Sequence, residues 1–344
     1  MEHHNLSSLM TTKNDKIRFR VRQMTNEDVP TVLEIWAKNN LHEGTHTIQS
    51  FMIQDPEGFI VAEQINDSDD LDGNPSQTIG NASIIGMCVG IFVHPTIAFI
   101  GMYGVQPELH GRGIGLAMWR KMLDHVGSLN AGLYAVPEHL TMYRDRAGFH
   151  QPDDRMLIIY ESDESDQLNV DILVPSIPET KIQRITTEWY SKVIDYDAQV
   201  HGYIRAKLLP HVFTEEGSIA FVASDTTGQR IFGYGCMRTN NIGKAMIGPL
   251  YANNGAVAEL LMRYLFSRLS TPFGKGLLYM TLDSNHGGQL IADKLCLKQQ
   301  EKIQRFFRFQ PYEGADWNRE FKSFDFLSNI TLLASSKLNR WRHG

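Results

Sequence analysis

Three glycines in the segment Val105–Trp119, VQPELHGRGIGLAMW, have the spacing that most directly suggests chemistry. Gly111, Gly113 and Gly115 alternate with other residues, and an apolar pattern with helical spacing follows at once. A glycine-rich turn between a strand and a helix lets backbone N–H groups face an anion, because the first four N–H groups of a helix have no partner within it. The segment therefore predicts a phosphate-binding site at the start of a helix.

The kind of phosphate ligand is narrowed by the residues around these glycines. A dinucleotide-binding loop requires a glycine where this chain has Leu116, and a nucleoside-triphosphate loop requires a Gly-Lys-Ser/Thr sequence that does not follow here. The pattern V-x-P followed by Q/R-x-x-G-x-G/A is similar to the pyrophosphate segment of the GNAT superfamily of acyl-CoA transferases. FRVRQMTNEDVPTVLEIW resembles the opening strand and helix of that family, and MYRDRAGF resembles the helix that carries the family tyrosine.

The resemblance implies an acetyl-CoA site built on this loop. Val105 would offer its amide to the pantetheine or to the thioester carbonyl. Tyr143 would give a proton to the leaving thiolate, although it lies one residue further from Phe149 than is commonest in the family. The loop residues implied to bind the CoA pyrophosphate are His110, which stands where the family usually has Gln or Arg, Gly111, Arg112, Gly113, Ile114 and Gly115.

Amine acylation also requires a base, because a primary amine with a pKa near ~10 arrives charged. The expected fourth strand, IAFIGMY, contains no carboxylate, so the candidate bases are His42 and Glu43 in LHEGTHT, with His46 beside the acceptor. The same segment spells His-Glu-x-x-His, in which two histidines four apart on a helix can share a zinc ion. Gly44 and Thr45 are poor helix formers, so a zinc hydrolase is a remote alternative and no metal is expected.

The order of predicted elements divides the chain into two α/β (α+β) units, each a mixed central sheet flanked by helices. Residues 16–160 form the first unit, which begins at KIRFRVRQM and closes with the strand RMLIIYE. The acidic and proline-containing segment 161–180 predicts a linker, and residues 181–312 repeat the same order of elements. Residues 1–15 are expected to be a mobile tail and residues 313–344 a C-terminal extension.

The second unit is expected to have lost the cofactor. Placed without a gap on the glycine segment, IGPLYANNGAVAELL puts Pro249 on Pro107 and Gly255 on Gly113, but Val257 stands where Gly115 would be. A valine there would crowd a pyrophosphate, so this unit is predicted not to bind CoA.

The second unit also carries a family signature of its own. It resembles the degenerate domain of YitH-type two-domain acetyltransferases, and YDAQVHGYIRAKLL carries the D-x-x-x-x-G-x-x-R signature of that domain. The resemblance implies that Asp197 and Arg205 contact the substrate. A helix with a solvated charged face is the plainer alternative.

Composition limits the classes of function that remain. The 344 residues are 42% hydrophobic with a net charge of −6, which predicts a globular protein with no nucleic-acid partner. Three widely spaced cysteines indicate a reducing compartment, and no segment has the apolar length of a secretion signal or a membrane span. The sequence therefore predicts a cytoplasmic or nucleocytoplasmic protein with no membrane partner.

The leading hypothesis is an enzyme that moves an acetyl group from acetyl-CoA to a primary amine of a small molecule or a protein, by direct attack in a ternary complex. The alternative from another class is a non-catalytic CoA-sensing or protein-binding module.

Overall fold

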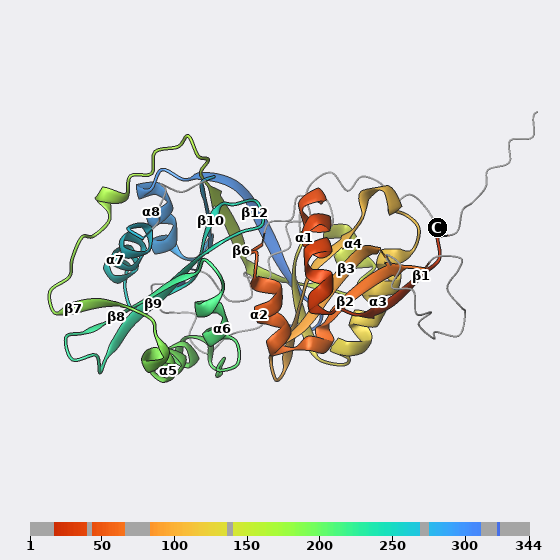
Figure 1. The fold of residues 1–344 in the computed structure, drawn as a ribbon, viewed down its shortest axis with the longest axis horizontal. Coiled ribbons are helices and arrows are strands. Elements are labelled where there is room, and N and C mark those ends of the chain that lie inside the picture. Colours follow the sequence, from red (N-terminus) through yellow and green to blue (C-terminus); the bar gives the residue numbers. More distant parts are fainter. Residues whose placement is uncertain are drawn as a thin grey trace, which may run out of the picture.

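The computed structural model describes residues 17–39, 43–65, 83–135, 140–268, 275–310 and 322–323. Within these residues thirteen strands form one mixed sheet, with helices packed on both of its faces. Figure 1 shows two lobes, with β6 and β12 running from one lobe to the other. The predicted fold class, two tandem units with mixed strands flanked by helices, is confirmed. The predicted N-terminal tail and most of the C-terminal extension lie outside the described residues.

Among the described residues the first half contains six strands and four helices, of which the helix Thr47–Gln54 was not expected from the sequence. Its strands are β1 (Phe19–Gln23), β2 (Phe59–Gln64), β3 (Ile84–His94), β4 (Ile97–Val105), β5 (Asn130–Ala135) and β6 (Gln151–Glu161). Its helices are α1 (Val29–Lys38), α2 (Thr47–Gln54), α3 (Ile114–Val126) and α4 (Leu140–Asp145).

Residues next to one another in the sequence stabilise the start of α1. The Thr25 N–H donates to Asp28 Oδ2 at 2.8 Å, which completes the capping box that these two residues predict. Pro30 lies in the first turn of the helix, where a missing N–H costs nothing. Both features favour the start of a helix at this point of the chain.

The second half repeats this order. Its strands are β7 (Thr180–Arg184), β8 (Ile219–Asp225), β9 (Ile231–Thr239), β10 (Ala245–Ala252), β11 (Leu277–Leu282) and β12 (Lys298–Phe307), followed by β13 (Lys322–Ser323). Its helices are α5 (Tyr190–His201), α6 (Leu209–Thr214), α7 (Gly255–Phe266) and α8 (His286–Lys294).

The last strands of the two halves are exchanged. The strand order is β1-β2-β3-β4-β5-β12-β6-β11-β10-β9-β8-β7, with β13 on β10. The strand beside β5 is therefore β12 of the second half, while β6 pairs with β12 and β11. The predicted strand RMLIIYE lies within β6, and this strand pairs with β11 and β12 of the second half rather than with β5.

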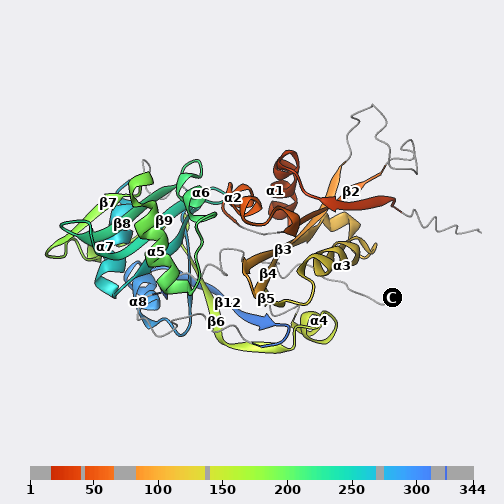
Figure 2. The same ribbon diagram turned by 90° about the horizontal axis from the view of Figure 1, so that it is seen from below.

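Helices on the two faces of the sheet enclose different cores. Figure 2 shows α1 and α2 on one face of the first-half strands and α3 and α4 on the other. One continuous core joins α1 and α2 with α5 and α6, whereas α3 with α4, and α7 with α8, cover separate cores. The two halves therefore meet along the face that carries α1 and α2.

Candidate active site

The central feature of the site is the place where β4 and β5 stop pairing, which is called the opening between these strands below. These parallel strands pair only over Ile97–Phe99 and Asn130–Gly132. Further along β4 the register against β3 shifts, and Met102 has a φ of +52° there. This left-handed conformation costs a residue with a Cβ about 1–2 kcal/mol, so it persists only because the surrounding fold imposes it. The bulge accompanies the separation of two strands that are paired at their beginning.

Val105 turns its backbone polar groups into this opening. The Gln106 N–H donates to the Ile85 carbonyl at 2.9 Å, which makes these two residues a hydrogen-bonded pair of the antiparallel ladder. Hydrogen-bonded and non-hydrogen-bonded pairs alternate along an antiparallel ladder. The preceding residue, Val105, which is opposite Gly86, therefore directs its N–H and C=O away from β3. The end of β4 therefore presents backbone groups to any ligand that enters between β4 and β5.

The glycine loop joins β4 to the N-terminus of α3, as predicted. Gly111 and Gly113 have φ values of +78° and +81°, and a Cβ added at either would meet no atom within 4 Å. The backbone conformation requires these glycines, and the space around them is open. Gly113 is the N-cap residue of α3, and no side chain among the described residues caps the helix. The first N–H groups of α3 are thus available to an anion, which would gain about 0.3–1 kcal/mol from the helix dipole.

The His110 side chain contacts the end of β4. Its Nε2 lies 2.9 Å from the Val105 carbonyl oxygen, and the Asn39 Nδ2 donates to the same oxygen at 3.2 Å. The Val105 carbonyl therefore already has two partners, which leaves the Val105 N–H as the group available to a thioester. Contact between His110 and a pyrophosphate stays a prediction, as do the contacts of Arg112 and Ile114.

Two phenols lie on the α3 side of the opening. Tyr143 on α4 is 6% exposed and packs against Trp119 with 5.8 Å between ring centroids. Tyr103 on β4, which the sequence analysis did not single out, also contacts Trp119, at 5.9 Å. Burial raises the pKa of both phenols, and the nearby Cys88 thiol adds to the effect. The alternation of β4 was a usable signal, since Tyr103 lies two residues before Val105 and hence on the same face.

Gly115 is required for a different reason from its two neighbours. A Cβ at this position would lie 2.0 Å from the Tyr103 Oη and 3.0 Å from the Cζ of that ring. Gly115 therefore leaves room for the Tyr103 side chain, in addition to any ligand bound at the loop.

The segment around Glu43 lies where the two halves meet. The Thr45 N–H donates to the Thr239 carbonyl at 3.0 Å, and the Asn241 N–H donates to the Glu43 carbonyl at 2.9 Å. Glu43 is 3% exposed, its Oε1 accepts the Gly44 N–H, and burial raises the pKa of its carboxyl to about 8. Glu43 is therefore enclosed between the halves, and its role as a base stays a prediction.

Of the two histidines in this segment, only His46 lies among the described residues. His42 lies outside the described residues, and His46 is a half-exposed residue immediately before α2. The zinc alternative requires both histidines on one helix, but α2 begins only at Thr47, so that arrangement is wrong. Across the part of the chain that the structure describes, no group of three His, Cys, Asp or Glu residues could hold a metal ion.

Asp197 and Arg205 are brought together inside the second half. They are 0% and 3% exposed, and the Arg205 Nε donates to Asp197 Oδ2 at 2.7 Å, while the Tyr234 hydroxyl also donates to the carboxylate. Burial acts to raise the pKa of Asp197, but the Arg205 charge and these hydrogen bonds hold it below its usual range. Asp197 lies on α5 and Tyr234 on β9, so this buried cluster links the two elements. The alternative of a solvated charged face is therefore wrong for Asp197 and Arg205. Contact with a substrate stays a prediction.

The second half has no counterpart of the glycine loop. Two residues, ending at Asn254, separate β10 from α7, whereas residues 106–113 separate β4 from α3. The alignment without a gap is therefore wrong at Pro249, which lies within β10 rather than after it. The Asn254 side chain accepts the Val257 N–H at 3.1 Å, so this helix start satisfies one of its own N–H groups.

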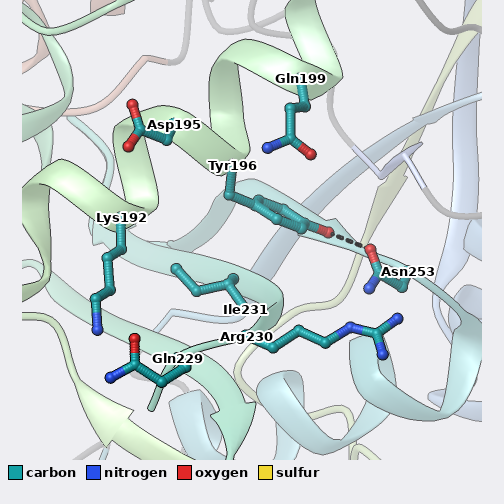
Figure 3. A pocket seen from close by; sticks show the side chains of 8 residues that line it. All are labelled: Lys192, Asp195, Tyr196, Gln199, Gln229, Arg230, Ile231 and Asn253. Atoms are coloured by element: carbon teal, nitrogen blue, oxygen red, sulfur yellow. Dashed lines mark hydrogen bonds between the residues drawn. The ribbon is translucent and has the colours of Figure 1, made fainter.

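Figure 3 shows a polar hollow in the second half, beside α5 and the start of β9. The Tyr196 hydroxyl donates to Asn253 Oδ1 at 3.0 Å across one side of it. None of the predicted site residues lines it, so it is separate from the opening between β4 and β5. Its lining residues are Lys192, Asp195, Tyr196, Gln199, Gln229, Arg230, Ile231 and Asn253.

Comparison with known proteins defines the class to which this fold and site belong. The model of the acetyltransferase (GNAT) family matches residues 23–151, and that of an acetyltransferase (GNAT) domain matches residues 193–305. The chain belongs to the GNAT superfamily of acyltransferases and contains two GNAT domains in tandem. The resemblance inferred from the sequence motifs is thereby confirmed.

Individual relatives agree with this assignment. The chain is similar to the holothin acyltransferase of Pseudoalteromonas sp. (strain SANK 73390), with 27% identity over 73% of this chain and 78% of the relative. A candidate acetyltransferase of Pyrococcus horikoshii shares the fold with a TM-score of 0.58 and 18% identity, over 93% of this chain and 96% of the other. A tandem GNAT protein of the clavulanic acid biosynthesis pathway has the same TM-score, with 13% identity over 84% and 98%.

Among the residues that the structure describes, no helix is both long and apolar enough to span a bilayer.

Proposed function

We propose that the protein transfers an acetyl group from acetyl-CoA to the primary amine of a small molecule. The observation that carries this proposal is the juxtaposition of an uncapped α3 N-terminus with the open end of β4. The loop N–H groups suit the pyrophosphate of CoA, and the Val105 N–H suits the thioester or the pantetheine. A small-molecule acceptor is supported by the similarity to an enzyme named for acylating holothin.

The chemistry follows from the groups around the opening. A neutral amine attacks the thioester carbonyl, a C–N bond forms, and the C–S bond breaks. The leaving thiolate needs a proton, and the Tyr143 phenol is the proposed donor. Tyr103 is a second phenol on the same wall. The amine must lose a proton, and Glu43 is the proposed base. Because burial raises the pKa of its carboxyl to about 8, the carboxylate form that accepts the proton dominates only above that pH.

Cofactor binding tests the loop assignment directly. Gly113→Val places a β-branched residue at a φ of +81°, so we expect CoA affinity to fall by at least tenfold in a calorimetric titration. Gly217→Val is the matched control, since Gly217 also has a positive φ (+75°) and open space but lies in the second half. Equal affinity for CoA in wild type and Gly113→Val would defeat the assignment.

Turnover separates the enzyme from a CoA-binding module. A panel of small primary amines with acetyl-CoA should release free thiol, which a colorimetric thiol reagent detects. Tight CoA binding with no thiol release for any amine would instead favour the non-catalytic alternative.

A further inference from the structure

The sheet of the second half divides in the same way as that of the first. The parallel strands β10 and β11 pair only at Ala245 and Met246 with Leu277 and Leu278. Beyond this point the register of β10 against β9 shifts, just as the register of β4 against β3 shifts beyond the paired beginning of β4. A split between two parallel strands is therefore present in both halves.

The strand β13 lies in the split of the second half. It runs antiparallel to β10, with Ser323 opposite Leu250 and Lys322 opposite Tyr251. The same two residues of β10 pair with β9 on their other edge. Because a strand has only two edges, β13 lies on the edge of β10 that faces β11, and it also contacts β11. A segment of the C-terminal extension is thus inserted where β10 and β11 separate.

The backbone of β10 explains why a strand is held there. N–H and C=O groups that lie inside a sheet need hydrogen-bond partners. Neighbouring residues of an antiparallel ladder alternate in direction, so of Leu250 and Tyr251 one directs its backbone groups to β9 and the other directs them to β13. β13 therefore continues on this edge of β10 the pairing that β11 provides at the beginning of the strand.

The corresponding edge of the first half has no such strand among the described residues. There the Val105 N–H faces the opening between β4 and β5, and the glycine loop leaves the first turn of α3 without a side-chain cap. In the second half the Asn254 side chain caps α7, and β13 pairs with the end of β10. Both features that suit CoA in the first half are thus taken up by the chain's own residues in the second.

We propose that the second half uses the split between β10 and β11 as a peptide-binding site, and that the C-terminal segment containing Lys322 and Ser323 is its ligand. Addition of a strand to a sheet edge gains affinity from main-chain hydrogen bonds, so an extended peptide suits this site. The C-terminal segment therefore acts as an intramolecular ligand that closes the second split. This inference concerns the second half alone and does not depend on the acetyl transfer proposed for the first.

Paired substitutions in the full-length chain test whether the backbone of β13 is held in the split. Proline has no N–H, so Lys322→Pro/Ser323→Pro removes the donors of β13, whereas Lys322→Ala/Ser323→Ala changes the same side chains and keeps both donors. In the proline variant, hydrogen exchange at the Leu250 or the Tyr251 amide should become about tenfold faster. In the alanine variant it should stay within about twofold of wild type.

Binding of a separate peptide tests the site itself. A labelled peptide with the sequence of residues 317–328 should bind the proline variant. Wild type should bind it about tenfold more weakly, because its tethered segment competes at a high effective concentration. The same peptide with proline at both β13 positions should bind neither protein. The affinity for CoA should be equal in wild type and both variants, since the glycine loop lies in the first half.

Several results would overturn the proposal. They are failure of the peptide to bind the proline variant, equal binding to wild type and this variant, or unchanged exchange of the β10 amides in it. An alanine variant that behaves like the proline variant would also contradict the proposal, because side chains rather than the backbone would then hold the segment. If the proline variant fails to fold, which faster exchange throughout β3 would reveal, wild type decides: slow exchange at both Leu250 and Tyr251 supports the proposal, and fast exchange at either one contradicts it.

Discussion

The contact between Gly115 and Tyr103 supports a prediction whose size follows from the structure. In Gly115→Ala the new Cβ would lie 2.0 Å from the Tyr103 Oη, so either the ring or the first turn of α3 must move. Overpacking of this kind costs about 1–3 kcal/mol. Alanine in place of glycine within a helix contributes up to about 1 kcal/mol in the opposite direction. Gly115 has no positive φ, so no backbone strain adds to these two effects.

A double-mutant cycle separates the two effects. Tyr103→Leu removes the ring that the new Cβ would meet, so Gly115→Ala should stabilise the protein in that background while it destabilises or leaves unchanged the wild type. Urea unfolding of the wild type, the two single variants and the double variant should give a coupling free energy of about 1–3 kcal/mol.

CoA titrations of the same four proteins extend the test to function. We expect Gly115→Ala to weaken CoA binding through the displaced first turn of α3, and Tyr103→Leu to restore part of it. Unfolding free energies that add within about 0.5 kcal/mol would refute the reasoning, because Gly115 would then be required by the cofactor alone.

Three further predictions concern the region where the halves meet. Burial raises the pKa of Glu43 to about 8, so the native protein keeps a proton that the unfolded chain releases near pH 4.5. The free energy of unfolding should therefore fall as pH rises through this window, and Glu43→Gln should flatten that slope in urea unfolding from pH 5 to 9; parallel slopes would contradict it. Arg305 is fully buried against Asp153, so Asp153→Asn should lower the free energy of unfolding by about 3–5 kcal/mol, and a loss below about 1 kcal/mol would count against this ion pair. A chain that ends after residue 165 lacks β12, the neighbour of both β5 and β6, and should show no cooperative thermal transition by circular dichroism, whereas a folded monomeric fragment would argue against the strand exchange.

Features that depend on neighbouring residues could be predicted from the sequence. The capping box at Thr25 and the turn at Gly111 and Gly113 are set by backbone geometry and hydrogen bonds within a few residues. The same holds for the position of Tyr143 on a short helix. Such features depend only on the order of neighbouring residues, so the family and the glycine turn before α3 could be inferred from the sequence.

Contacts between distant residues could not be predicted in the same way. Asn39 and Val105 are 66 positions apart, and nothing near either residue indicates their hydrogen bond. Tyr103 could have been placed on the face of Val105 by strand alternation, but its contact with Gly115 depends on how α3 packs on β4. The gapless alignment of the two halves was wrong at Pro249. The residue pattern does not reveal that the loop before α7 is shorter than the loop before α3.

The sequence by itself determined the class of fold, the glycine loop and the chemistry that such a loop serves, because each depends on short-range geometry. The tertiary structure alone decided the exchange of β6 and β12, the enclosure of Glu43 between the halves, and the approach of α1 to the end of β4. The physical reason is that hydrogen bonds between strands and the burial of side chains join residues far apart in the chain, and these pairings are settled only when the whole sheet forms.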